Sequence, residues 1–298
     1  MPNRTDANIV VLAGGVSSRM KASAAGSPAV GESIIRDAET KPKAMIRVGK
    51  DRRPFLDFLL ENIAQAGYRR MVIVVGDRDD TIRNYYSRGP GAGQFPDLSI
   101  SYAVQTIPSG RRKPAGTAEA LLEALRTQPE WSKRKFTVCN SDNLYSATAL
   151  GLLLDDAHRN AMVDYDRSAL NFPAERIGQF AVVERTPEGF VKDLVEKPSP
   201  GEITQAADSA GRIGVSMNIF RFSYDEIVPL LKLISPHPVR QEKELPAAVR
   251  AMVSRDPHSM FAIPLSEHVP DLTSLSDLPD LISLLQERNA RDPRGGSL

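Results

Sequence analysis

The sequence has few of the residues that stabilise small secreted domains or metal-built folds. Its single cysteine, Cys139, excludes an intramolecular disulfide, and its four histidines stand in no HExxH or Cys/His spacing of the kind that holds zinc. With 298 residues, 41% of them hydrophobic, the chain can bury a large core without disulfides or metal. This cysteine usage fits a reducing compartment, and we expect a cytoplasmic protein.

Two further absences narrow the function. The 38 Lys and Arg residues nearly balance 37 Asp and Glu residues, so the basic excess of a general nucleic-acid binder is missing. No apolar run approaches the ~20 residues needed to cross a bilayer, and the polar start of the chain does not resemble a signal peptide. We therefore expect neither a nucleic-acid nor a membrane partner. A local basic pocket for a small anion and a homo-oligomer both stay open.

Apolar periodicity in the first half of the chain predicts alternating strands and helices. Residues 8–13 form a continuous apolar run that ends at Gly14-Gly15, which is typical of a strand buried on both faces. Similar runs predict strands at 71–76, 100–105 and 136–139, and helical spacing predicts helices at 56–64, at 79–86, from 116 onward and at 147–159. This alternation predicts an α/β fold with a Rossmann-like, doubly wound, mainly parallel sheet. Ligands should then lie beyond the carboxyl ends of its strands.

The second half of the chain has a different order of predicted strands and helices. Consecutive strands are expected at 177–185, 190–195 and 212–222, followed by helices at 224–233 and 242–254, a strand at 260–264 and a last helix starting at 274–277. We interpret residues 1–160 as one half of a single domain. Residues 161–288 would extend the same sheet and add a small lid that binds a second substrate, and residues 289–298 would form a disordered tail.

The most informative segment follows the first predicted strand. It reads Leu12-Ala13-Gly14-Gly15-Val16-Ser17-Ser18-Arg19-Met20, a strand end, a glycine pair, small hydroxyl residues and an arginine. Glycines let the backbone approach a ligand, N–H groups in such a turn bind anions, and Arg19 adds bidentate phosphate donors. The segment matches neither GxxxxGK[ST] nor GxGxxG. A plain strand-to-helix turn with a surface arginine is the alternative interpretation.

Two charged residues of the first half also stand out. Lys43 precedes the apolar stretch Ala44-Met45-Ile46, a position where a lysine is usually only a solvated charge. Asp142 follows the predicted strand 136–139 in Asn140-Ser141-Asp142-Asn143. A carboxylate at the carboxyl end of a strand can hold Mg²⁺ together with substrate phosphates. An Asx turn that closes the strand is the alternative for Asp142.

Together these three segments resemble the sugar-1-phosphate nucleotidyltransferase family, whose members are also called sugar-nucleotide pyrophosphorylases. In that family a strand leads into a glycine-rich loop ending in Arg-Met or Arg-Leu. A Lys-Pro-Met-type segment then supplies a catalytic lysine, and an aspartate after a central strand binds metal. Further matches in family order extend the resemblance over nearly the whole chain, at Gln105, Gly116-Thr117, Gly178, Glu196-Lys197-Pro198, Asn218 and Asp271.

The resemblance implies a fold of the nucleotide-diphospho-sugar transferase type and a Mg²⁺-dependent reaction. A nucleoside triphosphate and a sugar-1-phosphate would react to give a nucleotide-sugar and pyrophosphate. The family pattern implies catalytic roles for Arg19, Lys43, Asp142 and Lys197, and Mg²⁺ ligands at Asp142 and Asp271. The nucleotide-binding residues that it implies are Leu12, Ala13, Gly14, Gly15, Gln105, Gly116 and Thr117. The substrate-binding residues that it implies are Asn143, Gly178, Glu196, Lys197 and Asn218.

The sequence departs from the family pattern at several places. The stretch between Arg19 and Lys43 is longer than usual and rich in Ala, Gly and Ser, and Ala44 replaces a common proline. Residues 109–114 form an insertion between Gln105 and Gly116, which bears on the choice of base. Pro270 stands where an aromatic residue often precedes the second aspartate, which bears on the placing of Asp271.

Two other functions compete with this one. A glycosyltransferase of similar fold would hold metal through an Asp-x-Asp motif, and Asp164-Tyr165-Asp166 offers one, but such an enzyme explains neither the glycine pair nor Lys43. A non-catalytic homologue that binds nucleotide-sugar is the second alternative, against which the retention of Arg19, Lys43 and Asp142 argues. For the base, the amide of Gln105 can pair with the N3–H and O4 edge of uracil or thymine, which favours UTP or dTTP.

Overall fold

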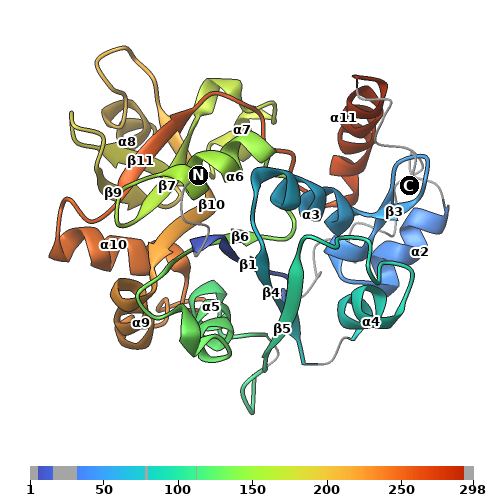
Figure 1. Ribbon diagram of the computed structural model, residues 1–298. Helices are drawn as coiled ribbons and strands as arrows, with labels where there is room; N and C mark the ends of the chain where they lie inside the picture. Colours follow the sequence, from blue (N-terminus) through green and yellow to red (C-terminus); the bar gives the residue numbers. More distant parts are fainter. Residues whose placement is uncertain (1–5, 16–31, 78–79, 112, 292–298) are drawn as a thin grey trace.

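The computed structural model describes residues 6–15, 32–77, 80–111 and 113–291, without the side chains of 32, 33 and 287–291. One nine-stranded sheet runs through the described residues in the order β11-β7-β10-β6-β1-β4-β5, and the β8–β9 hairpin joins it at β10 (Figure 1). The strands are β1 (Asn8–Leu12), β4 (Arg70–Gly76), β5 (Ser99–Gln105), β6 (Lys135–Asn140), β7 (Ala161–Asp166), β8 (Val182–Arg185), β9 (Val191–Val195), β10 (Gly214–Ser223) and β11 (Phe261–Leu265).

Along the path from β11 to β5, most neighbouring strands are parallel. Parallel pairing joins β6 to β1, β1 to β4, β4 to β5 and β7 to β11, whereas β10 runs antiparallel between β6 and β7. The doubly wound, mainly parallel α/β fold predicted from the periodicity is therefore confirmed. The predicted boundary at residue 160 falls between two elements of one continuous sheet.

Helices cover both faces of the sheet. They are α2 (Glu32–Thr40), α3 (Phe55–Ala66), α4 (Thr81–Arg88), α5 (Thr117–Arg126), α6 (Ala147–Asp155), α7 (Ala174–Ile177), α8 (Pro200–Gln205), α9 (Tyr224–Leu233), α10 (Leu245–Arg255) and α11 (Leu278–Arg291). Because side chains alternate along a strand, Ile9 and Val11 pack on the side of α3 and α6, and Val10 and Leu12 on the side of α5, α9 and α10. This two-sided burial explains the uninterrupted apolar run in β1.

The predicted elements of the first half agree closely with the structure, and those of the second half agree less well. Gly67 ends α3 in the left-handed conformation (φ 100°), as a helix-stopping glycine should. The strand predicted at 177–185 is wrong in its first part, because Pro173 starts the short helix α7 and the strand begins only at Val182. The helix predicted to reach residue 159 ends at Asp155. The prediction lacked the strand β7 and the helix α2.

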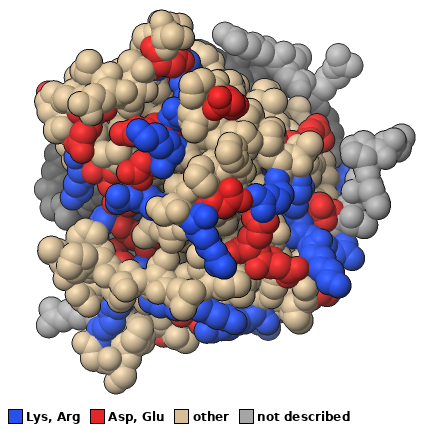
Figure 2. Space-filling model, turned by 90° about the vertical axis from the view of Figure 1, so that its left-hand side faces the viewer, with Lys and Arg blue, Asp and Glu red and all other residues tan. Residues whose placement is uncertain are grey.

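The two ends of the chain lie only partly within the described residues. Helix α11 continues to Arg291, so the predicted tail boundary at 289 falls inside a helix, and residues 292–298 lie outside the described part. Among the described helices, none is both long and apolar enough to cross a membrane. Basic and acidic side chains are interspersed on the face seen in Figure 2, in keeping with the balanced composition.

Candidate active site

The carboxyl ends of β1 and β6 form the floor of a cavity of about 360 Å³. The two strand ends stay side by side because the Ser141 N–H donates to the Leu12 carbonyl at 3.1 Å. Every residue predicted to bind nucleotide lines this cavity, together with Lys43 and Asp142. The full lining is Leu12, Ala13, Gly14, Gly15, Pro42, Lys43, Ala44, Gln105, Lys113, Pro114, Gly116, Thr117, Ala120, Asn140, Ser141, Asp142, Glu242 and Glu244.

Lys43 and Asp142 meet inside this cavity although they are 99 residues apart. Lys43 is the first residue of η3 (Lys43–Met45), a 3₁₀ helix of one turn. The next two side chains of that turn, Ala44 and Met45, are buried in the core. With the turn anchored on this apolar side, the Lys43 Nζ lies 3.3 Å from Asp142 Oδ2. A cation and a carboxylate therefore face the same hollow beside the glycine pair.

Asp271 joins Asp142 through backbone pairing. The segment after β11 forms an antiparallel bridge between Asp271 and Asn143, and the Leu272 N–H donates to the Asp142 carbonyl at 2.8 Å. Burial and the neighbouring Asp142 carboxylate raise the pKa of Asp271. This backbone pairing brings together the two segments that contain the aspartates predicted to bind Mg²⁺.

Carboxylates are the ligands that a hard divalent cation prefers, and in this structure the Asp271 carboxylate is paired with Arg176 and accepts a hydrogen bond from Thr273. The described residues contain no group of three or more His, Cys, Asp or Glu side chains arranged around a common metal position. Mg²⁺ does not require such a group, because it is usually held by one or two carboxylates plus substrate phosphates and water. Burial is the main cause of the raised pKa of Asp271, and a divalent cation next to Asp142 would oppose the second cause, the repulsion between the two carboxylates.

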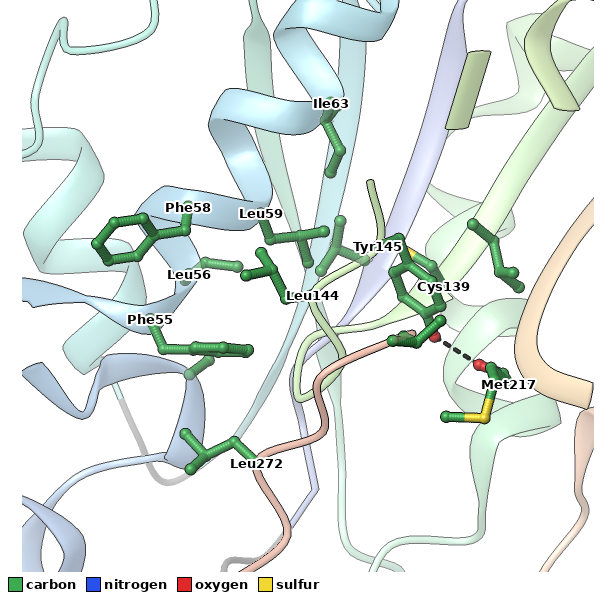
Figure 3. Packing of buried hydrophobic residues seen from close by; sticks show 14 of the residues in the cluster. Phe55, Leu56, Phe58, Leu59, Ile63, Cys139, Leu144, Tyr145, Met217 and Leu272 are labelled. Carbon is green, nitrogen blue, oxygen red and sulfur yellow. Dashed lines mark hydrogen bonds between the residues drawn. The ribbon is translucent and has the colours of Figure 1, made fainter. Parts of the chain in front are cut away.

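Two further side chains, neither singled out from the sequence, make contacts in this region: one pairs with Asp271, and the other joins the segment after Asp142 to β10. The Arg176 guanidinium lies 2.6 Å from Asp271 Oδ2 and stacks over the Phe172 ring, 4.4 Å from its centroid. The Tyr145 hydroxyl donates to the Met217 carbonyl at 2.7 Å, from within the apolar cluster around α3 (Figure 3). Both are contacts between segments distant in sequence, so no local pattern points to them.

At the other end of the cavity, Gln105 lies between two glycines. Its Nε2 donates to the Gly116 carbonyl at 2.8 Å, and its Oε1 lies 3.0 Å from where a Cβ on Gly14 would be. Gly116 has a φ of 110°, and a Cβ there would lie 2.3 Å from the Lys243 carbonyl oxygen. Both glycines thus let the backbone come close to neighbouring groups, Gln105 and the Lys243 carbonyl. We call the cavity beside them the nucleotide cavity, after the residues predicted to bind nucleotide that line it.

A second cavity of about 220 Å³ adjoins the first, with Thr117, Asn140 and Glu244 lining both. Its lining contains three of the predicted substrate-binding residues, Glu196, Lys197 and Asn218. Lys197 and Asn218 both have left-handed backbones, with φ of 49° and 56°. Such conformations are uncommon for residues other than glycine and tend to occur at functional sites. We call this hollow the second-substrate pocket.

Arg240 completes the second-substrate pocket. It comes from the segment between α9 and α10, and its Nη2 lies 2.9 Å from Glu196 Oε2 and 2.5 Å from Glu244 Oε2. Burial and the nearby Glu196 carboxylate raise the pKa of Glu244. The sequence analysis missed Arg240 because it stands in a polar loop without a recognisable motif.

Not every predicted residue lies in these two cavities. Asn143 is buried and accepts the Tyr145 hydroxyl at 3.3 Å, and Gly178 caps α7 while its neighbour Gln179 lines the second-substrate pocket. Asp271 lines a separate cavity of about 640 Å³ beside Arg176. Arg19 lies outside the described residues.

The Asp-x-Asp motif of the alternative glycosyltransferase does not form a ligand site. The side chain of Asp164 is fully buried, and its carboxylate pairs with Arg185 at 2.9 Å and with Arg212 at 2.7 Å. A carboxylate enclosed by two arginines in this way serves the packing of β7 against β10. The Asp-x-Asp motif therefore no longer supports the glycosyltransferase alternative.

Comparison with known proteins gives a consistent result. Residues 38–265 match the family model described as nucleotidyl transferase. The chain is 27% identical over 207 residues to glucose-1-phosphate adenylyltransferase 1 of Vibrio cholerae, a match that covers 68% of this chain and 47% of that protein. It is 23% identical over 173 residues to glucose-1-phosphate adenylyltransferase of an Anaeromyxobacter species, covering 58% and 41%.

Among solved structures, a UDP-glucose pyrophosphorylase complexed with UDP-glucose superimposes with a TM-score of 0.67. The superposition covers 94% of this chain and 98% of that one, at 17% sequence identity, and so reports on the fold alone. The chain spans less than half the length of the curated relatives named above.

Proposed function

Because the chain belongs to the nucleotidyl transferase family, we propose that it transfers a nucleotide from a nucleoside triphosphate to a sugar-1-phosphate and releases pyrophosphate. The observation that supports this most is the pair of adjoining cavities. One contains the glycine pair, Lys43 and Asp142, and the other contains Glu196, Lys197 and Asn218. Two substrates bound side by side would meet near Asn140 and Thr117, which line both.

The chemistry needs charge stabilisation more than proton transfer. By analogy with other phosphate esters, the second phosphate pKa of a sugar-1-phosphate is about 6, so the attacking oxygen is already ionised at neutral pH. It attacks the α-phosphorus, and the bond from that phosphorus to the bridging oxygen of pyrophosphate breaks. The main obstacle is repulsion between two polyanions, because each unit-charge contact at ~4 Å is worth roughly 4 kcal/mol at an effective dielectric of ~20.

The cationic side chains supply this stabilisation. Lys43 would contact the phosphates at the reacting centre, and Lys197 would contact the sugar phosphate. Glu196 would accept hydrogen bonds from sugar hydroxyls, and the Asn218 amide would accept or donate them. From the sequence alone, Arg19 is assigned to the β- and γ-phosphates. These groups bind and orient the two substrates in line.

Asp142 and Asp271 would hold Mg²⁺, which supplies Lewis-acid stabilisation of phosphate charge when bound. Their own contribution is to keep two carboxylates adjacent, and Asn143 and Leu272 fix that spacing through backbone pairing. Lys43, which touches Asp142, keeps that carboxylate directed into the nucleotide cavity.

For the base we propose a preference for UTP or dTTP. The Gln105 amide uses one N–H for the bond to Gly116, which leaves its second N–H and its oxygen for a ligand. This donor and this acceptor match the O4 and N3–H groups of uracil or thymine. The named relatives include adenylyltransferases as well as a UDP-glucose pyrophosphorylase, so the choice of base needs a direct measurement.

The test is a pyrophosphate-release panel that crosses the common nucleoside triphosphates with several sugar-1-phosphates. We expect release only when both substrates and Mg²⁺ are present, with UTP or dTTP the fastest donor, and none after EDTA. Release of a nucleoside diphosphate when a nucleotide-sugar and an acceptor are supplied would support the glycosyltransferase instead. Nucleotide binding without any release would support the non-catalytic homologue.

A further inference from the structure

A buried carboxylate of α2 contacts the chain on both sides of the turn that contains Lys43. Asp37 is 3% exposed and receives two hydrogen bonds from the Arg47 guanidinium, from Nε to Oδ2 at 2.7 Å and from Nη2 to Oδ1 at 3.0 Å. The Lys41 Nζ lies 2.9 Å from Asp37 Oδ1. Helix α2 belongs to the stretch between Arg19 and Lys43 that is longer than the family pattern.

These contacts enclose a short loop. Lys41 precedes Lys43 by two positions, and Arg47 follows it by four. Between them the Met45 N–H donates to the Pro42 carbonyl at 2.9 Å and the Ile46 N–H to the Lys43 carbonyl at 3.0 Å. The two ends of the loop are therefore held at one carboxylate, while Lys43 projects from its middle toward Asp142.

The charge of Asp37 is firmly maintained. Burial alone would raise its pKa, but the hydrogen bonds from Arg47 and Lys41 outweigh burial and lower it to about 2. Bidentate pairing with arginine is also directional, so it restrains the orientation of the β2 strand (Arg47–Val48) as well as its distance from α2.

We propose that Asp37 is a positioning residue for catalysis, which fixes the Lys41–Arg47 loop so that the Lys43 ammonium faces Asp142 in the nucleotide cavity. This inference rests on the proposed function of Lys43. It assigns a role to the extended segment before the catalytic lysine, namely to supply the helix that positions it.

The test compares Asp37→Asn with Asp57→Asn. Asp57 is a matched control, because it is also fully buried and paired with an arginine, Arg53, at 3.3 Å, but it lies in α3 and accepts its hydrogen bonds from Arg53, Tyr86 and Gln94, which are outside the loop. We expect Asp37→Asn to lower kcat about tenfold to a hundredfold, as loss of an orienting contact commonly does, with the nucleotide KM nearly unchanged. Asp57→Asn should lower the melting temperature but leave kcat close to wild type.

Coupling to Lys43 gives the second readout. In a Lys43→Ala background, Asp37→Asn should lower kcat no further, because both changes remove the same interaction. Hydrogen exchange should become faster in residues 41–48 of Asp37→Asn and stay unchanged there in Asp57→Asn. Should Asp37→Asn fail to fold, Arg47→Lys serves instead, since it keeps the charge but loses the bidentate contact.

The proposal is overturned if Asp37→Asn keeps wild-type kcat, if both asparagine variants lose kcat equally, or if exchange in residues 41–48 does not change. Failure of the proposed function is recognised separately: the wild-type protein would then release no pyrophosphate with any substrate pair. Because the exchange measurement needs no activity, it tests the restraint on the loop in that case too.

Discussion

Lys43 shows how a single residue acquires a role through its surroundings. In sequence it is a lysine before an apolar stretch, and in the structure its ammonium lies 3.3 Å from Asp142 at the edge of a cavity. We expect Lys43→Ala to fold normally and to lower turnover about a hundredfold to a thousandfold, since one charged donor to the reacting phosphates is lost. Pyrophosphate release and thermal unfolding measure the two effects. Lys50→Ala, at an exposed position nearby, is the control and should change neither.

Gln105 is the residue on which base choice should depend. Gln105 is 4% exposed, and its side-chain amide donates to the Gly116 carbonyl. We expect Gln105→Ala to reduce the preference for UTP over CTP about tenfold, because a lost hydrogen-bond pair to the base costs roughly 1–3 kcal/mol of discrimination. The ratio of kcat/KM for the two nucleotides is the measurement, and an unchanged ratio would remove Gln105 from base recognition.

Asp37 also makes a pH-dependent contribution to stability. Its pKa in the folded protein is about 2, below the ordinary value of 3.8, so the stabilisation is complete above pH 4 and is lost as the pH falls through 2. We expect the free energy of unfolding of Asp37→Asn to be lower than that of wild type by about 1–2 kcal/mol at pH 7. The difference should shrink toward pH 2. Denaturant unfolding at both pH values checks the sign.

At the scale of elements, the loop between α9 and α10 connects the two cavities. Its Lys243 N–H donates to the Ala115 carbonyl at 2.7 Å, and the Ala118 N–H donates to the Lys243 carbonyl at 2.9 Å, on either side of Gly116. The same loop contributes Arg240 to the second-substrate pocket. The start of α5, which lines the nucleotide cavity, thus packs directly against the loop that lines the other cavity.

We therefore expect Gly116→Ala to disturb both substrates. Its φ of 110° and a Cβ placed 2.3 Å from the Lys243 carbonyl oxygen would force the loop away from α5. KM should rise for both the nucleotide and the sugar-1-phosphate, and the protein should lose more than about 1 kcal/mol of stability. Gly93→Ala is the matched control, because Gly93 also has a positive φ (75°) but has no neighbour within 4 Å of a Cβ. If the two variants change KM and stability equally, the effect of Gly116→Ala is due to backbone strain alone and not to the close approach of Lys243.

Elements with a single, long apolar pattern were predictable, and short or composite ones were not. Strands β1, β4 and β6 are buried on both faces, so each reads as an apolar run. Strand β7 ends in Asp164 and Asp166, and the charged residues hide its strand character because their arginine partners come from other segments. Helix α7 has only four residues, too few for a helical period.

For the whole molecule, we expect ligand binding to be visible as stabilisation. A nucleoside triphosphate with Mg²⁺ at about a hundred times its Kd adds about 2.7 kcal/mol to the free energy of unfolding. For a chain of this size that corresponds to a rise in melting temperature of roughly 4 °C. Differential scanning fluorimetry with and without EDTA measures it. Stabilisation that survives EDTA unchanged would argue against the metal site at Asp142 and Asp271.

By itself the sequence determined the alternation of strands and helices, the family and half of the residues that line the nucleotide cavity. This was possible because burial periodicity and strand-end motifs are local properties of the chain. Only the tertiary structure showed that Asp271 bridges to Asn143 next to Asp142, that Arg240 pairs with Glu196, and that Asp37 pairs with Arg47 beyond the turn of Lys43. The first two pairings join segments far apart in sequence, and the third spans a turn without a motif. Such contacts depend on how the whole sheet brings its strand ends and loops together, which no local pattern records.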